Sequence, residues 1–532
     1  MYSELQQQIA RRRTFAIISH PDAGKTTLTE KLLLYGGAVR LAGSVTARRN
    51  QRRSTSDWMA LEQQRGISVS STVLQFEFED HTINLLDTPG HEDFSEDTYR
   101  TLTAADSAVM LIDSAKGIEP QTRKLFEVCR LRRIPIFTFI NKMDRPGRPP
   151  LELLDELEGE FGISPFPFNW PIGSGTYFAG VYDRQQHQAH LYQRTQHGAY
   201  RAPVEVADLN DPKLESLIGG NELSSLRDDL ELLEGAGAQF DQQKFLTGEI
   251  SPTFFGSAVN NFGVDLFLQR FVQYAPQPGP HATAKEIIEP DDELFTGFIF
   301  KIQANMDPQH RDRVAFLRIC SGRFEKDMNV TNMRSGRQVR LSRPHKMFAQ
   351  ERETVEEAYP GDIIGLMNPG VFAIGDTVTS GRKVQFEGIP HFSPERFASL
   401  RTTSPAKRKS LQKGIDQLRE EGAIQVMWSP NSTDPILAAV GQLQFDVVKF
   451  RLETEYNVEV ILSPLSFVAA RWLSGSEQDL DNVILYSGTQ VVKDSEGLPV
   501  MLFQSEWHIN AAKEKNPNIT FSPVARGEAV MV

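Results

Sequence analysis

The sequence of 532 residues contains only two cysteines, Cys129 and Cys320, which excludes a disulfide framework and a thiolate metal site. Each cysteine lies within an apolar pattern, so we expect both to be core residues. No apolar run approaches the roughly 18 residues of a membrane-spanning helix, and the start MYSELQQQIARRR lacks the apolar stretch of a secretion signal. We therefore expect a cytoplasmic protein with no membrane partner.

Positive charge is not in excess: 57 Lys and Arg oppose 69 Asp and Glu, a formal net charge of -12. This balance argues against a general nucleic-acid coat. The charges are nevertheless segregated, with 10 basic against 3 acidic residues in 1–53 and again in 311–346, but 3 against 10 in 204–247. Such segregation would let selected faces approach a polyanion, although each run is also compatible with an ordinary solvated face.

The length and an ordinary composition, 40% apolar and 24% charged, predict several compact domains. The first 145 residues alternate helical spacing with short apolar runs that are typical of buried parallel strands. These runs are TFAIIS (14–19), TINLLD (82–87), SAVMLID (107–113) and IPIFTFIN (134–141). The pattern predicts a doubly wound α/β domain over 1–280, with an insertion at about 165–250.

Beyond that domain, strand-like runs punctuated by glycine predict an antiparallel β-barrel domain over 281–393. The rest of the chain, 394–532, mixes a charged helix, a second helix and short strands. It therefore predicts a third domain of the α+β class, in which Phe445, Val448 and Leu452 pack against a sheet.

The segment SHPDAGKTT (19–27) follows a predicted strand and opens a helix, which is the setting of a phosphate-binding loop. Lys25 would reach the β- and γ-phosphates, and Thr26 would place its hydroxyl on Mg²⁺. Ser19 stands where the general pattern has glycine, but it is still small. We expect the nucleotide to contact the loop formed by Ser19, His20, Pro21, Asp22, Ala23, Gly24, Lys25, Thr26 and Thr27.

A second motif, DTPGH (87–91), follows the strand TINLL. It places Asp87 at the carboxyl end of the sheet, where the carboxylate can hold a water of Mg²⁺. Thr88 and Pro89 continue the loop, and the Gly90 N–H can face the γ-phosphate. His91 is then placed to orient the attacking water, although a lone histidine is more often an ordinary polar residue.

A third motif, NKMD (141–144), follows the next strand and is expected to select the base. The Asp144 carboxylate can accept from N1–H and the amino group of guanine, donors that adenine does not present on that edge. Asn141 and Lys142 would brace the loop, and Ser257–Ala258 would offer a main-chain N–H to guanine O6. An ATP-binding P-loop enzyme would explain the first motif but not NKMD.

The segment RGIS (65–68) lies between the first helix and the strand VLQFEF, in a polar and basic stretch. We expect it to be a switch in which the Ser68 hydroxyl joins Mg²⁺ while the γ-phosphate is present. The alternative is a serine in a surface loop.

In this order the motifs resemble those of the translational GTPases. The chain is longer than elongation factor Tu and has an insertion that it lacks, whereas elongation factor G has two more domains at its C-terminal end. The segments SDWMALEQQRGIS (56–68), NMDPQHRDRVAFLRICSGRFEKDM (305–328), VEEAYPGDIIGL (355–366) and GQLQFDVVKFRLETEYNVEV (441–460) resemble the class II peptide-chain release factors of bacteria. This resemblance covers nearly the whole chain.

The resemblance implies a ribosome-dependent GTPase of translation termination, which uses GTP to drive class I release factors off the ribosome after peptide release. It implies GTP or GDP and Mg²⁺ as ligands, and ribosomal RNA, ribosomal proteins and class I release factors as partners. Asp22 resembles the aspartate that helps this family to bind a monovalent cation, while Ser68 stands where the family usually has threonine. We expect a monomer. The alternative is a guanine-nucleotide-switched binding protein that acts on another ribosomal state or on a partner outside the ribosome.

Overall fold

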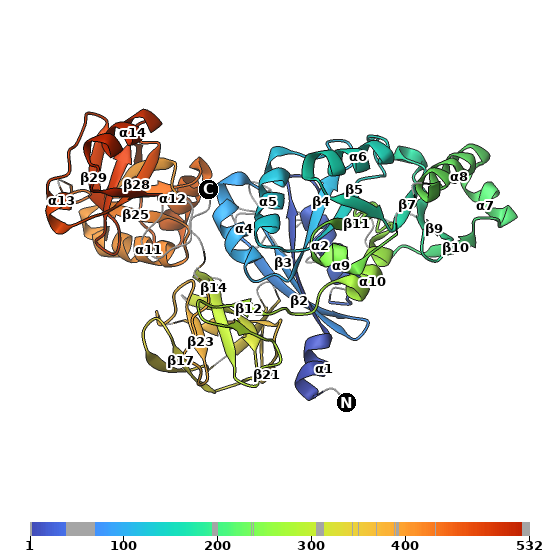
Figure 1. Ribbon diagram of the computed structural model, residues 1–532, viewed down its shortest axis with the longest axis horizontal. Helices are drawn as coiled ribbons and strands as arrows, with labels where there is room; N and C mark the ends of the chain where they lie inside the picture. The colour runs from blue at the N-terminus through green and yellow to red at the C-terminus, as the bar shows by residue number, and fades with distance from the viewer. Residues whose placement is uncertain are drawn as a thin grey trace.

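The computed structural model describes residues 3–38, 70–193, 200–235, 237, 239–304, 313–342, 344–348, 351–368, 370–387, 389, 393–430 and 432–523. The predicted switch residue Ser68 therefore lies outside the described residues. Figure 1 shows a large α/β body, a β body beside it and a mixed body at the C-terminal end of the described chain. Within these ranges no helix is both long and apolar enough to cross a membrane.

A seven-stranded sheet forms the centre of the large body, in the order β2-β3-β1-β4-β5-β11-β6. Neighbouring strands are parallel except for β2 and β3. The strands are β1 (Arg12–Ser19), β2 (Thr72–Phe78), β3 (His81–Asp87), β4 (Ser107–Asp113), β5 (Ile136–Asn141), β6 (Ser164–Pro167) and β11 (Ile250–Phe255). The parallel order brings the carboxyl ends of β1, β3, β4, β5 and β11 to one edge, where ligands bind in such sheets.

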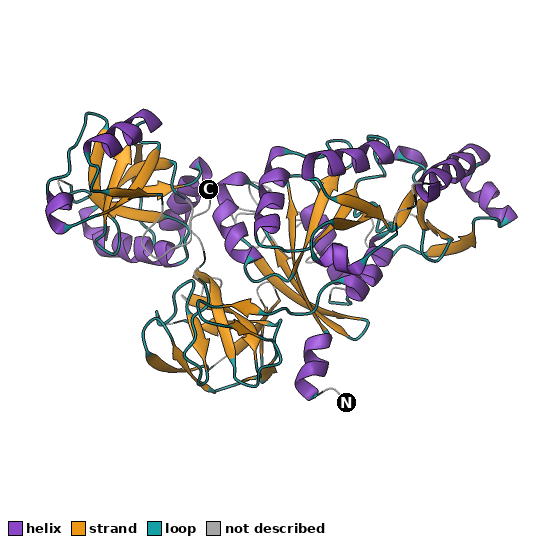
Figure 2. Cartoon of the chain, viewed as in Figure 1, coloured by secondary structure: helices purple, strands orange, loops and turns teal. Residues whose placement is uncertain are grey.

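Helices cover both faces of this sheet, as Figure 2 shows. Successive residues of β1 point to opposite faces, so that Phe15 and Ile17 join one core whereas Ala16 and Ile18 join the other. The first core is covered by α2 (Lys25–Tyr35), α9 (Gln242–Leu246) and α10 (Val264–Tyr274), and the second by α4 (Ser95–Leu102), α5 (Pro120–Leu131) and α6 (Pro150–Phe161). The predicted doubly wound fold is therefore confirmed. A short helix, α1 (Glu4–Ala10), precedes β1 and is capped by the Ser3 side chain.

The region predicted as an insertion carries a separate antiparallel sheet in the order β10-β9-β8-β7. Its elements are β7 (Asn169–Ile172), η2 (Gly175–Tyr177), β8 (Gly180–Asp183), β9 (Gln188–Tyr192), β10 (Val204–Asp208), α7 (Pro212–Ile218) and α8 (Gly220–Gly235). In Figure 1 these elements extend from the large body on the side away from the C-terminal body. The acidic residues of 204–247 therefore lie largely on this projection.

The β body is a curled antiparallel sheet in the order β18-β17-β23-β14-β15-β22-β19-β20, which agrees with the predicted barrel class. Its strands are β14 (Thr296–Ala304), β15 (Arg313–Ser321), β17 (Asn329–Asn332), β18 (Arg337–Arg340), β19 (Pro344–Phe348), β20 (Glu351–Thr354), β22 (Ile363–Met367) and β23 (Thr377–Thr379). Two small pairs accompany it, β12 (His281–Ala282) with β13 (Ile287–Ile288), and β16 (Phe324–Glu325) with β21 (Glu357–Ala358). Both cysteines are buried, as predicted.

Six basic residues that the structure describes in the stretch 311–346 form ion pairs. The pairs are Arg313–Glu420, Arg318–Asp106, Arg323–Glu357, Lys326–Glu356, Arg334–Asp376 and Arg340–Asp327. The sequence could not show whether these basic residues are solvated or paired, because all of their acidic partners except Asp327 lie outside the stretch. The pairing weakens the case for this stretch as a polyanion-binding face.

The third body has an eight-stranded sheet in the order β27-β24-β26-β25-β29-β30-β28-β31 with helices, which agrees with the predicted α+β class. Its elements are β24 (Arg396–Thr402), η4 (Pro405–Lys407), α11 (Arg408–Glu420), β25 (Gln425–Trp428), β26 (Pro435–Ala439), α12 (Gln442–Thr454), β27 (Val460–Pro464), β28 (Ala469–Ser474), α13 (Glu477–Asp481), β29 (Thr489–Lys493), β30 (Pro499–Phe503), α14 (Glu506–Lys515) and β31 (Thr520–Ser522). Phe445, Val448 and Leu452 lie in its core, as predicted.

Buried polar contacts join the large body to the β body. Arg12 Nε lies 2.8 Å from Asp362 Oδ2, and Arg318 Nη2 lies 2.6 Å from Asp106 Oδ2. The Gly361 carbonyl accepts a hydrogen bond of 2.7 Å from Thr14 Oγ1. Because such pairs are costly to break singly when they are buried, they favour a defined docking of the two bodies.

Candidate functional site

The loop between β1 and α2 turns sharply through two residues in the left-handed region, Asp22 at φ 67° and Gly24 at φ 99°. Gly24 is the N-cap of α2, and a Cβ at this position would collide with the Asn141 side-chain amide. Glycine is therefore required both by the backbone angle and by the close approach of Asn141. The loop leads directly into a helix N-terminus, whose main-chain N–H groups favour an anion such as a phosphate.

Lys25 and Asp87 lie side by side at this edge of the sheet. Lys25 Nζ is 2.6 Å from Asp87 Oδ1, and the side chains are only 8% and 2% exposed. The contact follows from the fold, because Lys25 begins α2 after β1 and Asp87 ends the neighbouring strand β3. The groups predicted to hold phosphate and Mg²⁺ are thus brought together.

The donor set fits Mg²⁺. Thr26 is the second residue of α2 and supplies a hydroxyl, and Asp87 supplies a carboxylate, both of which are hard oxygen donors. Among the described residues no group of three or more His, Cys, Asp or Glu side chains could hold a metal.

Asn141, the last residue of β5, joins the three nucleotide loops. Its Nδ2 donates to the Ala23 carbonyl at 2.9 Å, and its Oδ1 accepts from the Ala258 N–H at 2.9 Å. Asn141 and Ala258 are buried. The phosphate loop, the NKMD motif and the Ser257–Ala258 turn are therefore one connected unit, although 118 positions separate Asn141 from Ala23.

Lys142 braces the same unit from the other side. Its Nζ donates to the Asp22 carbonyl and to Asp113 Oδ2, the latter at 2.8 Å. Burial alone would raise the pKa of Asp113, but the hydrogen bond from Lys142 and the Ala115 N–H hold this pKa below its ordinary value. An ionised Asp113 therefore fixes the lysine beside the loop.

Asp144 is oriented by Ser257, whose Oγ donates to Asp144 Oδ1 at 2.6 Å. The Ser257 N–H donates to the Phe262 carbonyl at 2.9 Å, and the Ala258 N–H is directed to Asn141 Oδ1. Both main-chain donors that were expected to serve guanine O6 thus have protein acceptors.

The DTPGH loop packs against the phosphate loop. A Cβ on Gly90 would lie 3.4 Å from the Pro21 nitrogen and 3.5 Å from the His20 carbonyl carbon. Thr88 Oγ1 anchors the loop by donating to the Ile17 carbonyl at 2.6 Å. Gly90 is therefore held against the backbone of the phosphate loop.

His91 follows Gly90 at the start of η1 (Glu92–Phe94), and its side chain is 33% exposed. Its Nδ1 lies 3.3 Å from the Asp93 N–H, which donates to it, and 3.6 Å from Asp93 Oδ1. The ring lies edge-on to Phe94, with centroids 6.3 Å apart. Both contacts of the ring nitrogens involve Nδ1, and the imidazole is partly exposed.

This loop also contacts the third body. Asp93 Oδ2 accepts from the Leu443 N–H at 2.5 Å in the first turn of α12, and Gly441 at the helix N-cap leaves room for the carboxylate. Phe94 packs against Val447 of the same helix. The segment that follows Gly90 therefore caps a helix that lies about 350 positions later in the chain.

His20 has a contact that the motif did not reveal. The residue is 1% exposed, and its Nε2 lies 3.0 Å from Glu119 Oε2, just before α5. Burial lowers the pKa of His20, which the charge on Glu119 opposes. Glu119 could have been suspected only from its position ahead of a predicted helix, since nothing local links it to residue 20.

This burial predicts a pH dependence of stability. The unfolded chain titrates His20 near its ordinary pKa of 6.5, whereas the folded chain resists protonation. Below pH 6.5 the unfolded state therefore binds more protons, and stability falls with decreasing pH by up to about 1.4 kcal/mol per pH unit from this group. His20→Gln should flatten the dependence of the melting temperature on pH between 7.5 and 5.5. Parallel curves for the variant and the parent would contradict the assignment.

Taken together, a doubly wound sheet, a phosphate loop and a connected NKMD motif define a P-loop protein of the GTPase class. Residues 10–277 match the family model of the elongation factor Tu GTP binding domain, and residues 294–381 match elongation factor G domain 2. Residues 386–513 match the class II release factor RF3 C-terminal domain. The protein is thus a GTPase of the translation-factor type.

Relatives similar over the full length identify the particular family. The chain is 60% identical over 527 residues to peptide chain release factor 3 of Nostoc punctiforme, covering 99% of this chain and 97% of that protein. It is 60% identical over 524 residues to peptide chain release factor 3 of Gloeobacter violaceus, covering 98% and 99%. The chain belongs to the peptide chain release factor 3 family. A crystal structure from Thermus thermophilus, titled ttk003000868, shares the fold with a TM-score of 0.69 and 23% identity over 88% of this chain and 71% of that one.

Proposed function

We propose that the protein is a ribosome-dependent GTPase of translation termination, which promotes the dissociation of class I release factors after peptide release. The observation that carries this proposal is the combination of a connected guanine-nucleotide site with a class II release factor C-terminal domain on residues 386–513. The contact of Asp93 with α12 adds a physical link between these two parts.

In this proposal the phosphate loop, residues 19–27, holds the phosphates, with Lys25 as the main cation. Gly90 would donate its N–H to the γ-phosphate, because it already packs on the phosphate loop. Asp144 would accept from guanine, and Asn141 and Lys142 would keep its loop in place. His91 would orient the attacking water. Most catalysis would come from positioning and charge stabilisation, as is usual for phosphoryl transfer.

Thr26 and Asp87 would hold Mg²⁺, and we assign a further hydroxyl to Ser68. Mg²⁺ supplies charge neutralisation of the phosphate oxygens when it is bound. Within the part of the chain that the structure describes, Lys25 and Asp87 already form the electrostatic centre of this site. The Asp87 carboxylate would exchange its contact with Lys25 for a Mg²⁺ water as Lys25 turns to the phosphates.

The proposal also includes a monovalent cation beside the exposed Asp22. Its left-handed backbone at φ 67° presents the side chain at the outer turn of the phosphate loop. We expect GTP hydrolysis on ribosomes to be faster in potassium chloride than in choline chloride at equal ionic strength, and Asp22→Asn to abolish most of this difference. A potassium effect that persists unchanged in Asp22→Asn would assign the cation elsewhere.

The partners in this proposal are the ribosome and class I release factors, and the site of action is the cytoplasm, where ribosomes terminate. The protein would act as a monomer. The nucleotide state would be passed to the third body through Asp93 and Phe94, since both follow Gly90 within four residues and contact α12.

The decisive experiment measures the dissociation rate of a fluorescent class I release factor from post-termination ribosomes, with and without this protein and GTP. We expect GTP-dependent acceleration, and none with GDP. An unchanged rate, with guanine-nucleotide binding intact, would favour a nucleotide-switched protein that acts on another ribosomal state or on a partner outside the ribosome.

A further inference from the structure

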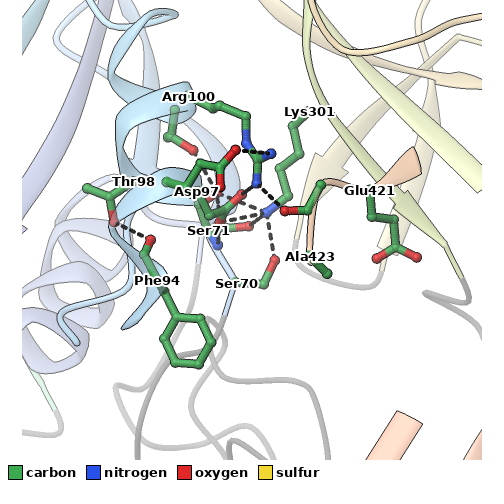
Figure 3. Close-up of polar contacts among 12 residues, drawn as sticks. Ser70, Ser71, Phe94, Asp97, Thr98, Arg100, Lys301, Glu421 and Ala423 are labelled. Carbon is green, nitrogen blue, oxygen red and sulfur yellow. Dashed lines mark hydrogen bonds and ion pairs between the residues drawn. The ribbon is translucent and has the colours of Figure 1, made fainter. Parts of the chain in front are cut away.

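Lys301 is a lysine of the β body that is buried against the large body. It lies on β14, and only 4% of its side chain is exposed. Its Nζ donates to Ser70 Oγ at 2.7 Å, to Ser71 Oγ at 2.9 Å and to the Ser71 carbonyl. It also lies 3.4 Å from Asp97 Oδ2 of α4 (Figure 3). These three partners of the ammonium group, Ser70, Ser71 and Asp97, belong to the large body.

The residues that Lys301 contacts lie next to the proposed Mg²⁺ site. Ser71 immediately precedes β2, and Thr72, the first residue of β2, is paired with Asp87 in the sheet. Ser71 is also held by Asp97, whose Oδ2 accepts from the Ser71 N–H at 2.6 Å and from Ser71 Oγ at 2.7 Å. Lys301 and Asp97 therefore both hold Ser71, which lies directly before Thr72, the residue that pairs with Asp87.

Asp97 belongs to α4, the helix that follows His91 and η1. Burial alone would raise its pKa, but Lys301, Arg100 and the hydrogen bonds from Ser71 hold the pKa below its ordinary value. The carboxylate is therefore ionised at neutral pH and needs a nearby cation. Removing Lys301 would leave Asp97 with weaker compensation, since Arg100 Nη2 is 3.8 Å from its Oδ1 and also donates to the Gly422 carbonyl of the third body.

We infer that Lys301 is a positioning residue for GTP hydrolysis, supplied by the β body to fix the start of β2 and the start of α4 relative to each other. This inference rests on the proposed GTPase site. The two elements flank the segment Asp87–His91, which contains the groups that would contact the γ-phosphate and its Mg²⁺. Lys301 therefore acts on these groups through Ser71 and Asp97, without touching the nucleotide.

The arrangement predicts that Lys301 supports the binding of GTP, through its γ-phosphate, more than the binding of GDP. GDP would depend mainly on Lys25, the phosphate loop and the guanine pocket, whereas Lys301 contacts Ser70, Ser71 and Asp97. The binding of GTP would in addition depend on the geometry around Asp87 and Gly90. Loss of Lys301 should therefore lower the affinity for GTP much more than the affinity for GDP.

The test compares Lys301→Met, which keeps the length of the side chain but removes the charge, with the parent protein. Affinities for a fluorescent non-hydrolysable GTP analogue and for fluorescent GDP are measured with Mg²⁺ and without ribosomes. We expect the affinity for the GTP analogue to fall about 10-fold and that for GDP to change less than 2-fold. Lys326→Met is the matched control, because Lys326 is a partly exposed lysine of the same body whose ion pair is with Glu356 of that body.

A rescue separates positioning from a general loss of stability. In Lys301→Met the partly buried Asp97 carboxylate lacks its main cation, so adding Asp97→Asn should restore part of the GTP affinity. Lys301→Arg should retain most of it, because Lys301 borders a pocket that Ser70, Asp97 and Arg100 also line, which gives room for the larger group.

The inference would be overturned if Lys301→Met lowers the affinities for the GTP analogue and for GDP equally. It would also be overturned if Lys301→Met and Lys326→Met have identical effects on these affinities. The inference would also be overturned if the losses of GTP affinity in Lys301→Met and Asp97→Asn simply add in the double variant. Failure of the parent protein to bind any guanine nucleotide would refute the proposed site itself, and is thereby distinguished from failure of the inference.

Discussion

Replacing His91 with alanine is expected to lower ribosome-stimulated GTP hydrolysis by about 10³-fold while leaving the affinity for GTP within about 2-fold. The ring lies directly after Gly90 and is not part of the contacts that join the nucleotide loops. Its Nδ1 accepts from the Asp93 N–H, so Nε2 is the nitrogen that would face the reacting water. Removing the imidazole takes away an interaction that matters in the transition state rather than in the bound ground state.

The measurement is single-turnover GTP hydrolysis on saturating ribosomes, combined with equilibrium binding of a GTP analogue. His81→Ala is a suitable control, because His81 begins β3 at the end of the strand opposite to Asp87. A His91→Ala protein that hydrolyses GTP at the parent rate would remove the histidine from the mechanism. A protein that loses binding and hydrolysis together would instead indicate a structural role of the ring in the DTPGH loop.

The nucleotide loops could be predicted from the sequence because each is a short motif that directly follows a strand. The motif supplies the residues, and parallel strands bring their carboxyl ends to one edge. The structure brings Gly24, Lys25, Asp87, Asn141 and Ala258 together, as that argument requires. The fold class could be predicted for a similar reason, since strands such as Ser107–Asp113 are buried along their whole length.

The contacts between bodies could not be predicted in this way. Lys301 is one lysine within the apolar strand TGFIFKIQA, and its partner Asp97 is 204 positions away. The burial of His20 against Glu119 likewise depends on how α5 packs behind the phosphate loop. Such pairs have no local pattern, because their chemistry becomes visible only when the tertiary fold removes both groups from water.

The contacts of the Ser257–Ala258 turn could be predicted only in part. The sequence predicted that Ser257–Ala258 and Asp144 serve the same base, and the structure brings Ser257 Oγ to the Asp144 carboxylate, to which it donates. It could not show that Asn141 Oδ1 already accepts from the Ala258 N–H. The latter contact depends on the side-chain amide of Asn141 reaching two loops at once, which is set by packing rather than by spacing.

Replacing Asp144 with asparagine should change the preferred base from guanine to xanthine. The carboxylate accepts two hydrogen bonds from guanine N1–H and its amino group, whereas an asparagine amide offers one donor that suits the C2 oxygen of xanthine. A buried polar site that loses its matching partner can discriminate by 10⁴-fold or more, so we expect GTP affinity to fall by about 10³-fold to 10⁴-fold. Ser257 Oγ can still donate to the amide oxygen that replaces Asp144 Oδ1, which orients the NH₂ group toward the base.

The exchange is best measured by competition of GTP and XTP against a fluorescent nucleotide, followed by ribosome-stimulated hydrolysis of each. Asp155→Asn, an identical chemical change at an exposed position of α6, controls for the loss of one negative charge. Hydrolysis of XTP by Asp144→Asn at a rate near that of GTP by the parent would show that the phosphate site works independently of the base. An unchanged preference for GTP would mean that Asp144 does not select the base.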